Sequence, residues 1–310
     1  MKKLFVMTLA VAALASCSKV EPIEPGYKSA IGFGKSFVEN STKALLDGTE
    51  IKKADGNFAV WGTEKQGTNA AVAIFAAEKI SWDGSAWGYT TQARYWHKDH
   101  VFNFAAVAPF SANTTVDLGA DLLPETATYT LAPELEDQVD LLYAKSNPNI
   151  TPDRDDFADK VNFTFDHMLA KVKFLIDSDY TTGYTVVIEG LQIKAAETAT
   201  VIFAHKAWTS HTGEVALPFA TSEIVSDATV ESNESLIIPN ATHSYVVSGT
   251  AKVKMGSTVV KTIPLNYTIS SPLEADNHYN ITALIKPGNP IQFDVEKVNG
   301  FPTPGDNIAM

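Results

Sequence analysis

Apolar and polar residues alternate with a period of two along most of the chain, which is the pattern of half-buried β-strands. In the stretch 29–38, Ile31, Phe33 and Phe37 fall on one face of an extended chain. The same alternation predicts strands at 57–62, 70–82, 85–96, 100–110, 161–177, 184–195, 198–208, 213–219, 234–240, 243–255, 257–269, 278–286 and 291–298. No segment carries a helical apolar stripe longer than about two turns. The pattern therefore predicts an all-β protein.

Two local signals and the spacing of the strands refine this prediction. Asp83-Gly84, between Trp82 and Trp87, is a β-hairpin signal. In 161–177 the apolar parity changes near Ala170, which predicts a bulge or a strand that passes from one sheet to the next. So many short strands favour two β-sandwiches. We expect the first at 29–177 and the second at 178–310, with loops and short strands in the proline-rich middle, 111–160.

The first 28 residues follow a different pattern. Lys2 and Lys3 precede an apolar run at 4–14, which is too short to span a bilayer and has the form of a secretory signal. The run ends in Leu-Ala-Ser-Cys, the bacterial lipoprotein box. This predicts a signal peptide at 1–16, acylation of Cys17, and a proline- and charge-rich tether at 17–28. The simpler alternative is an ordinary signal peptide with an incidental cysteine.

Charge and cysteine content exclude several classes of protein. The net charge is −12 and the pI is about 5.0, which disfavours nucleic acid and anionic membrane surfaces as partners. Cys17 is the only cysteine, so a disulfide within one chain and a cysteine-based zinc site are both ruled out.

The chemistry-bearing motifs give little support to catalysis, metal binding or a cofactor. His97 and His100 have an H-x-x-H spacing, but on a strand they point to opposite faces, and no third ligand stands at a recognisable spacing. His167 lies on the apolar parity of its strand and is expected to be a buried structural histidine. The acidic stretch 153–159 lacks the glycine and terminal glutamate of an EF-hand loop. No nucleophile elbow, phosphate loop or dinucleotide fingerprint is present.

Several segments together resemble the fimbrillin family, the subunits of type V pili in Bacteroides-like Gram-negative bacteria. They are the lipoprotein box, FAVWG, ARYW followed by VFNFAAVAPF, DLLYA, FTFDHMLAKVKF, and a closing HYNITALIK with IQFDVEKV. The resemblance covers about 30 to 300. It implies two transthyretin-like β-sandwiches in tandem, export through the periplasm as a lipoprotein, and a place in the outer membrane or on the cell surface. It also implies a structural rather than enzymatic role, in adhesion.

The resemblance further implies assembly by strand exchange. A trypsin-like protease would cut between Lys43 and Ala44. The strand at 30–38, which carries Ile31, Phe33 and Phe37, would then leave its sandwich. A strand from another subunit would replace it, with the C-terminal 291–298 as donor. The donor side chains are Ile291, Phe293 and Val295. The implied partners are other fimbrial subunits, the lipid of the outer membrane, and ligands on host or bacterial surfaces.

Two alternatives stay open at this point. The family's cleavage sites more often carry arginine than a lysine such as Lys43, and an uncut chain would resemble the anchor subunits that keep their lipid. The second alternative is a surface lipoprotein that binds glycans on a β-sandwich face. It requires exposed rows of aromatic side chains.

Overall fold

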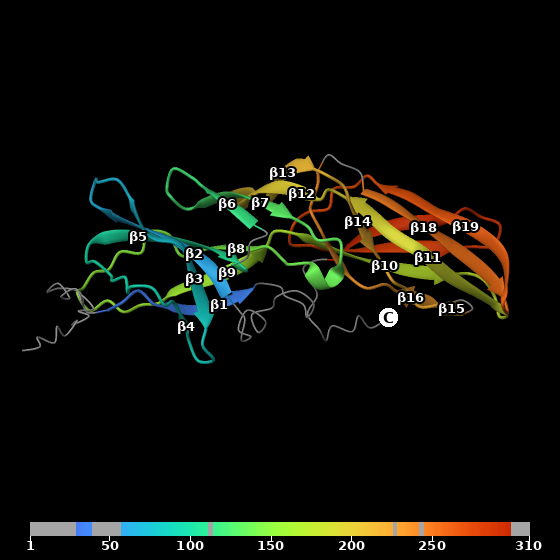
Figure 1. Cartoon of the computed structure of the whole chain (residues 1–310), viewed down its shortest axis with the longest axis horizontal. Helices are drawn as coiled ribbons and strands as arrows, with labels where there is room; N and C mark the ends of the chain where they lie inside the picture. Colours follow the sequence, from blue (N-terminus) through green and yellow to red (C-terminus); the bar gives the residue numbers. More distant parts are fainter. Residues whose placement is uncertain (1–28, 39–56, 111–113, 226–227, 242–244, 299–310) are drawn as a thin grey trace, which may run out of the picture.

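The chain is almost entirely β-structure in the computed structural model, which describes residues 29–38, 57–110, 114–225, 228–241 and 245–298. This confirms the all-β prediction. The strands form an elongated molecule (Figure 1), with a barrel at one end and two five-stranded sheets at the other. Two single-turn 3-10 helices, η1 (Leu135–Asp137) and η2 (Phe203–His205), interrupt the strands. In the described part of the chain, no helix reaches the length and apolarity that crossing a membrane requires.

Seven strands close into a barrel in the order β1-β4-β3-β2-β5-β8-β9. They are β1 (Phe33–Val38), β2 (Asn57–Gln66), β3 (Val72–Trp82), β4 (Trp87–Gly88), β5 (His100–Ala108), β8 (Leu142–Lys145) and β9 (Val161–His167). Alternate residues of each strand point inward, so the barrel is filled with aromatic rings. The hairpin predicted at Asp83-Gly84 is confirmed, because Trp82 pairs with Trp87 and the Asp83 N–H donates to the Ala86 carbonyl at 3.1 Å.

A four-stranded sheet lies between the barrel and the far end of the molecule (Figure 1). Its order is β13-β12-β7-β6, with β6 (Thr114–Leu118), β7 (Pro124–Thr130), β12 (Thr198–Ile202) and β13 (Ala207–Thr212). The antiparallel pairing of β7 with β12 joins segments far apart in the sequence, for example Tyr129 with Ala199.

Two sheets build the far end. The first has the order β16-β10-β20-β21, with β17 beside β10. It contains β10 (Ala170–Ser178), β16 (Thr229–Glu231), β17 (Ser235–Ile237), β20 (His278–Ile285) and β21 (Gln292–Val298). The second has the order β14-β11-β18-β19, with β15 beside β11. It contains β11 (Tyr184–Ala195), β14 (Val215–Pro218), β15 (Ile224–Val225), β18 (Tyr245–Met255) and β19 (Thr258–Ile269). Aliphatic and aromatic side chains from both sheets share one core.

The parity change predicted near Ala170 is a change of sheet. β9 belongs to the barrel, and β10, which begins at Ala170, pairs with β20 in the first far sheet. The domain division expected between 177 and 178 stays a prediction. Strand pairing crosses that point in both directions. β10, which spans it, pairs with the later strand β20, and β12, which follows it, pairs with the earlier strand β7.

Buried polar groups tie the middle of the molecule together. Gln138, next to η1, donates through Nε2 to Ser235 Oγ at 3.0 Å and accepts the Leu236 N–H at 2.8 Å, which fixes the segment to β17. His167 is fully buried as expected, and its Nδ1 contacts Asp140 Oδ2. Because an unpaired polar group is costly to bury, these pairs fix the positions of the segments that carry Gln138 and Asp140.

Candidate functional site

The most distinctive part of the barrel is the position of β1. β1 pairs in parallel with β9, with Phe33 opposite Val161 and Val38 opposite Phe165. Along its other margin, pairing with described residues is confined to the start, where Phe33 is opposite Trp87 of β4. Just upstream, the Ile31 N–H donates to the Arg94 carbonyl at 2.7 Å. Within the part of the chain that the structure describes, β1 is therefore paired with β9 at both of its ends, but with its opposite neighbours only at its N-terminal end.

Two side chains anchor this segment in the barrel core. Ile31 is 1% exposed and Phe33 is 2% exposed. The Phe33 ring packs against four others at centroid distances between 5.7 and 6.5 Å, those of Phe58, Phe75, Tyr89 and Phe163. Burial of each such apolar side chain contributes about 1.5–3 kcal/mol. Removal of β1 would leave an apolar slot beside an unpaired margin of β9.

Gly34 allows β1 to approach β9 closely. A Cβ atom at this position would lie 2.4 Å from Asn162 Oδ1, so a larger residue would require that side chain to move. A glycine inside an alternating strand often marks a close approach of two backbones, and this signal was present in the sequence.

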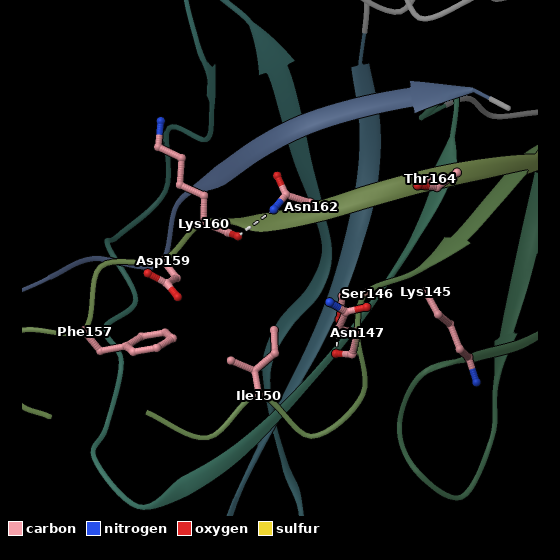
Figure 2. A pocket seen from close by; sticks show the side chains of 9 residues that line it. All are labelled: Lys145, Ser146, Asn147, Ile150, Phe157, Asp159, Lys160, Asn162 and Thr164. Atoms are coloured by element: carbon pink, nitrogen blue, oxygen red, sulfur yellow. Dashed lines mark hydrogen bonds between the residues drawn. The ribbon is translucent and has the colours of Figure 1, made fainter. Parts of the chain in front are cut away.

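A polar hollow of about 540 Å³ lies along the outer side of β9, next to β1 (Figure 2). Lys160 and Asn162 stand beside the β1 ribbon in this view, and the Asn162 Nδ2 donates to the Lys160 carbonyl at 3.3 Å. Asp159 is the only acid among the described residues of the lining. Hydrolysis of a glycosidic bond uses two carboxyl groups, so this hollow does not have the side chains of a glycosidase site.

The expected donor segment is the edge strand of the first far sheet. β21 pairs with β20 on one margin, and no described strand pairs with the other. Ile291, Phe293 and Val295 are half-buried, and the Phe293 ring stacks on Tyr267 with a centroid distance of 4.7 Å. The residues that alternate with them, Gln292, Asp294 and Glu296, are exposed. β21 therefore has one apolar face and one polar face.

The family comparison matches residues 42–297 to the fimbrillin-like family model. This chain belongs to the fimbrillin-like family. A fimbrial role, a place at the cell surface and association with other fimbrial subunits follow at the level of the family. A comparison with curated proteins found no match.

Solved structures with the same fold come from Bacteroides species. A fimbrial protein of Bacteroides vulgatus superposes with a TM-score of 0.64 at 16% identity, over 88% of this chain and 99% of that one. A candidate cell adhesion protein of Bacteroides uniformis gives 0.53 at 17% identity, over 87% and 98%. A candidate cell adhesion protein of Bacteroides ovatus gives 0.51 at 12%, over 89% and 98%. At these identities the likeness concerns the fold.

Four further predicted site residues of this fimbrillin-like protein have side chains that the structure does not describe. Cys17, Lys43 and Ala44 lie outside the described residues. The backbone of Phe37 pairs with Thr164, after a register shift between Phe33 and Ser36, and its side chain is also outside the description. Their roles in acylation, cleavage and strand displacement stay predictions.

The surface bears on the glycan-binding alternative. Among the described residues, Phe110 is the only phenylalanine, tyrosine or tryptophan that is exposed. A platform for sugar rings needs several exposed aromatic side chains in a row. The described surface of this fimbrillin-like protein offers no such row.

Proposed function

We propose that this fimbrillin-like protein is a structural subunit of a type V fimbria that polymerises by strand exchange and has no catalytic activity. In the proposal it is exported as a lipoprotein acylated at Cys17 and is then cut between Lys43 and Ala44. The cut frees β1, and a strand of another subunit takes its place. The observation that carries the proposal is that the segment 31–38 buries Ile31 and Phe33, whereas the C-terminal half of β1 is paired with other described residues along only one margin.

The energetics of the vacated position favour a strand as its occupant. Loss of β1 exposes the backbone donors and acceptors of β9 next to an apolar slot, and an added strand satisfies both. Each new main-chain hydrogen bond contributes about 0.5–1.5 kcal/mol. Each apolar side chain that fills the slot contributes about 1.5–3 kcal/mol, so the side chains dominate the affinity.

β21 has the properties that a donor needs. It already is a strand, it lies at a sheet edge, and its apolar side chains are only half-buried in its own subunit. Transfer into a closed apolar slot would bury Phe293 and Val295 more fully than their present position does. The alternation of the strand matches the requirement that every second side chain enters the core.

The position of the expected cut fits release of β1. Lys43 follows β1 within five residues, and the next described strand, β2, begins at Asn57. A cut between them separates β1 from the body of the barrel without breaking any described strand. The acylated N-terminus at Cys17 would leave together with β1.

The test compares Lys43→Gln with Lys53→Gln, a matched control in the same connection between β1 and β2. Surface material from cells that express each variant is examined by N-terminal sequencing and by unheated gel electrophoresis. We expect an N-terminus at Ala44 and a ladder of polymers for the wild type and Lys53→Gln, and neither for Lys43→Gln. A ladder from Lys43→Gln that equals the wild-type ladder would refute the proposed cut.

A second variant tests the donor. A chain that ends at 290 lacks β21 and should still be cut at Ala44, but should form no polymers. Polymers of normal length from this chain would exclude β21 as the donor. Wild-type material that stays uniformly acylated at Cys17 and monomeric would instead indicate a non-polymerising anchor subunit.

A further inference from the structure

Three side chains with metal-binding atoms meet at one end of the barrel. Glu64 lies near the end of β2, His100 begins β5, and His97 stands in the turn before β5. β2 and β5 are antiparallel neighbours, with Glu64 opposite Phe102 and Gln66 opposite His100. Glu64 and His100 are thus diagonal neighbours on the same face of the sheet.

A tight turn brings His97 to the same place. The His100 N–H donates to the His97 carbonyl at 3.3 Å, and Asp99 in this turn has a left-handed φ of 61°. The Asp99 N–H donates to the Pro152 carbonyl at 2.9 Å, which fixes the turn to a neighbouring connection. The two imidazole rings consequently lie 5.1 Å apart between centroids. Two histidines with an H-x-x-H spacing in an extended strand would point to opposite faces, but this turn brings both side chains to the same place.

The ligand atoms converge on a single point. Nδ1 of His97 and Nδ1 of His100 both contact Oε1 of Glu64, and the distance from His100 Nδ1 to this oxygen is 2.5 Å. All three ligand atoms lie within 4.8 Å of one another. Atoms that each bind one zinc ion at about 2.0–2.2 Å are separated by at most about twice that length. Small rotations of these side chains are enough to place one ion between them.

The donor set and its surroundings select the class of ion. Two imidazole nitrogens and one carboxylate oxygen suit Zn²⁺ and similar transition metals, whereas Ca²⁺ and Mg²⁺ prefer oxygen ligands alone. The Glu64 side chain is 10% exposed, and those of His97 and His100 are 28% and 20% exposed. The site is therefore partly shielded, with an open side toward solvent. The Phe102 ring, 6.4 Å from the His97 ring, flanks the site within the barrel.

We propose that Glu64, His97 and His100 form a Zn²⁺ site in which a water molecule occupies the fourth position. The ion would join β2, β5 and the turn between His97 and His100 at the barrel end, and so stabilise the barrel. The alternative is a carboxylate that accepts hydrogen bonds from two imidazole rings without an ion. It requires a proton on Nδ1 of both rings.

Calorimetric titration of the untagged, chelator-treated chain with ZnCl₂ distinguishes these two states. We expect saturable binding of one Zn²⁺ per chain. His97→Ala and His100→Ala each remove a direct ligand. The loss of affinity should therefore exceed the roughly 10- to 100-fold that loss of an outer-shell partner costs. His205→Ala, which removes an exposed histidine elsewhere, serves as the control and should bind as the wild type does.

Thermal unfolding provides a second measurement that does not depend on the heat of binding. Saturating Zn²⁺ should raise the Tm of the wild type and of His205→Ala, because a ligand that binds the folded state stabilises it. Glu64→Gln keeps the shape of the side chain and should lose most of this shift. The proposal is overturned if the wild type shows no saturable binding, or if His97→Ala and His100→Ala bind Zn²⁺ as the wild type does.

Discussion

Substitution of Phe33 by alanine measures how strongly β1 is held in the barrel of the uncut chain. The ring is 2% exposed and packs against four aromatic rings of the barrel, so its loss leaves a cavity with walls from β2, β3 and β9. Truncation of a buried phenylalanine to alanine typically costs about 3–5 kcal/mol. We expect Phe33→Ala to lower the free energy of unfolding of the uncut chain by this amount. Phe174→Ala, in the core of the far end, is the matched control.

Urea unfolding followed by tryptophan fluorescence measures the effect, because Trp87 and Trp96 are buried in the same barrel core as Phe33. The same measurement is repeated after trypsin treatment and removal of the released N-terminal peptide. The cut form of Phe33→Ala should then unfold as the cut wild type does, whereas Phe174→Ala should stay destabilised in both forms. The reasoning about β1 would be refuted if Phe33→Ala lowered the free energy of unfolding of the uncut chain by less than about 1 kcal/mol, which is the effect of a typical point mutation. A difference between Phe33→Ala and wild type that persists after the cut would also refute it.

Three further predictions concern the barrel and the far end. A Cβ at Gly62 would lie 2.7 Å from the Phe104 ring, so Gly62→Ala should lower the free energy of unfolding by about 1–3 kcal/mol through overpacking. Gly88→Ala should not, because a Cβ at Gly88 would lie in open space. Urea midpoints give both values. Burial, reinforced by a nearby lysine, lowers the pKa of His278 from its usual 6.5 to about 4. As the pH falls, the unfolded chain therefore binds the proton before the folded chain does, and the free energy of unfolding should decrease between about pH 6.5 and about pH 4. His278→Gln should remove this dependence in unfolding curves measured at several pH values. Gln138→Ala should cost about 1–3 kcal/mol in thermal or urea unfolding, because it leaves the buried backbone of β17 without its partner.

The sequence was most informative about strands and their faces. Alternation identified the all-β class, the Asp83-Gly84 hairpin was correct, and the parity change near Ala170 marks the passage from β9 to β10. These are local properties of the chain. The pairing of β7 with β12 and the parallel pairing of β1 with β9 are not local. Alternation shows which face a residue occupies, but it does not show which strand lies alongside.

The same distinction explains what was found and missed in the sites. Ile31 and Phe33 are buried as their alternation suggested, whereas a register shift after Phe33 interrupts the simple pattern before Phe37. Glu64 was missed as a third ligand because it stands 33 residues from His97 in the sequence. Only the register between β2 and β5, together with the turn before His100, brings these side chains together.

The unequal pairing of β1 sets the direction in which it should leave the barrel. The expected cut creates a free end on the Val38 side, where β9 is the only described strand that pairs with β1. The opposite end is held by the Phe33 pair with β4, by the bond from Ile31 to Arg94, and by two buried side chains. An incoming strand therefore meets β9 first near Phe165 and displaces the Ile31 end last.

If the Ile31 end is the last to leave, weakening it should speed the final step. We expect Ile31→Ala to raise the rate at which the N-terminal peptide separates from the cut chain, because truncation of a buried isoleucine removes about 2–5 kcal/mol of the contacts that hold it. Reverse-phase chromatography of the free peptide at intervals after trypsin treatment measures this rate. Cutting itself should proceed as in the wild type, since Lys43 is unchanged. Equal separation rates for Ile31→Ala and wild type would show that the barrier lies elsewhere along β1, and that the order of displacement argued from the pairing is wrong.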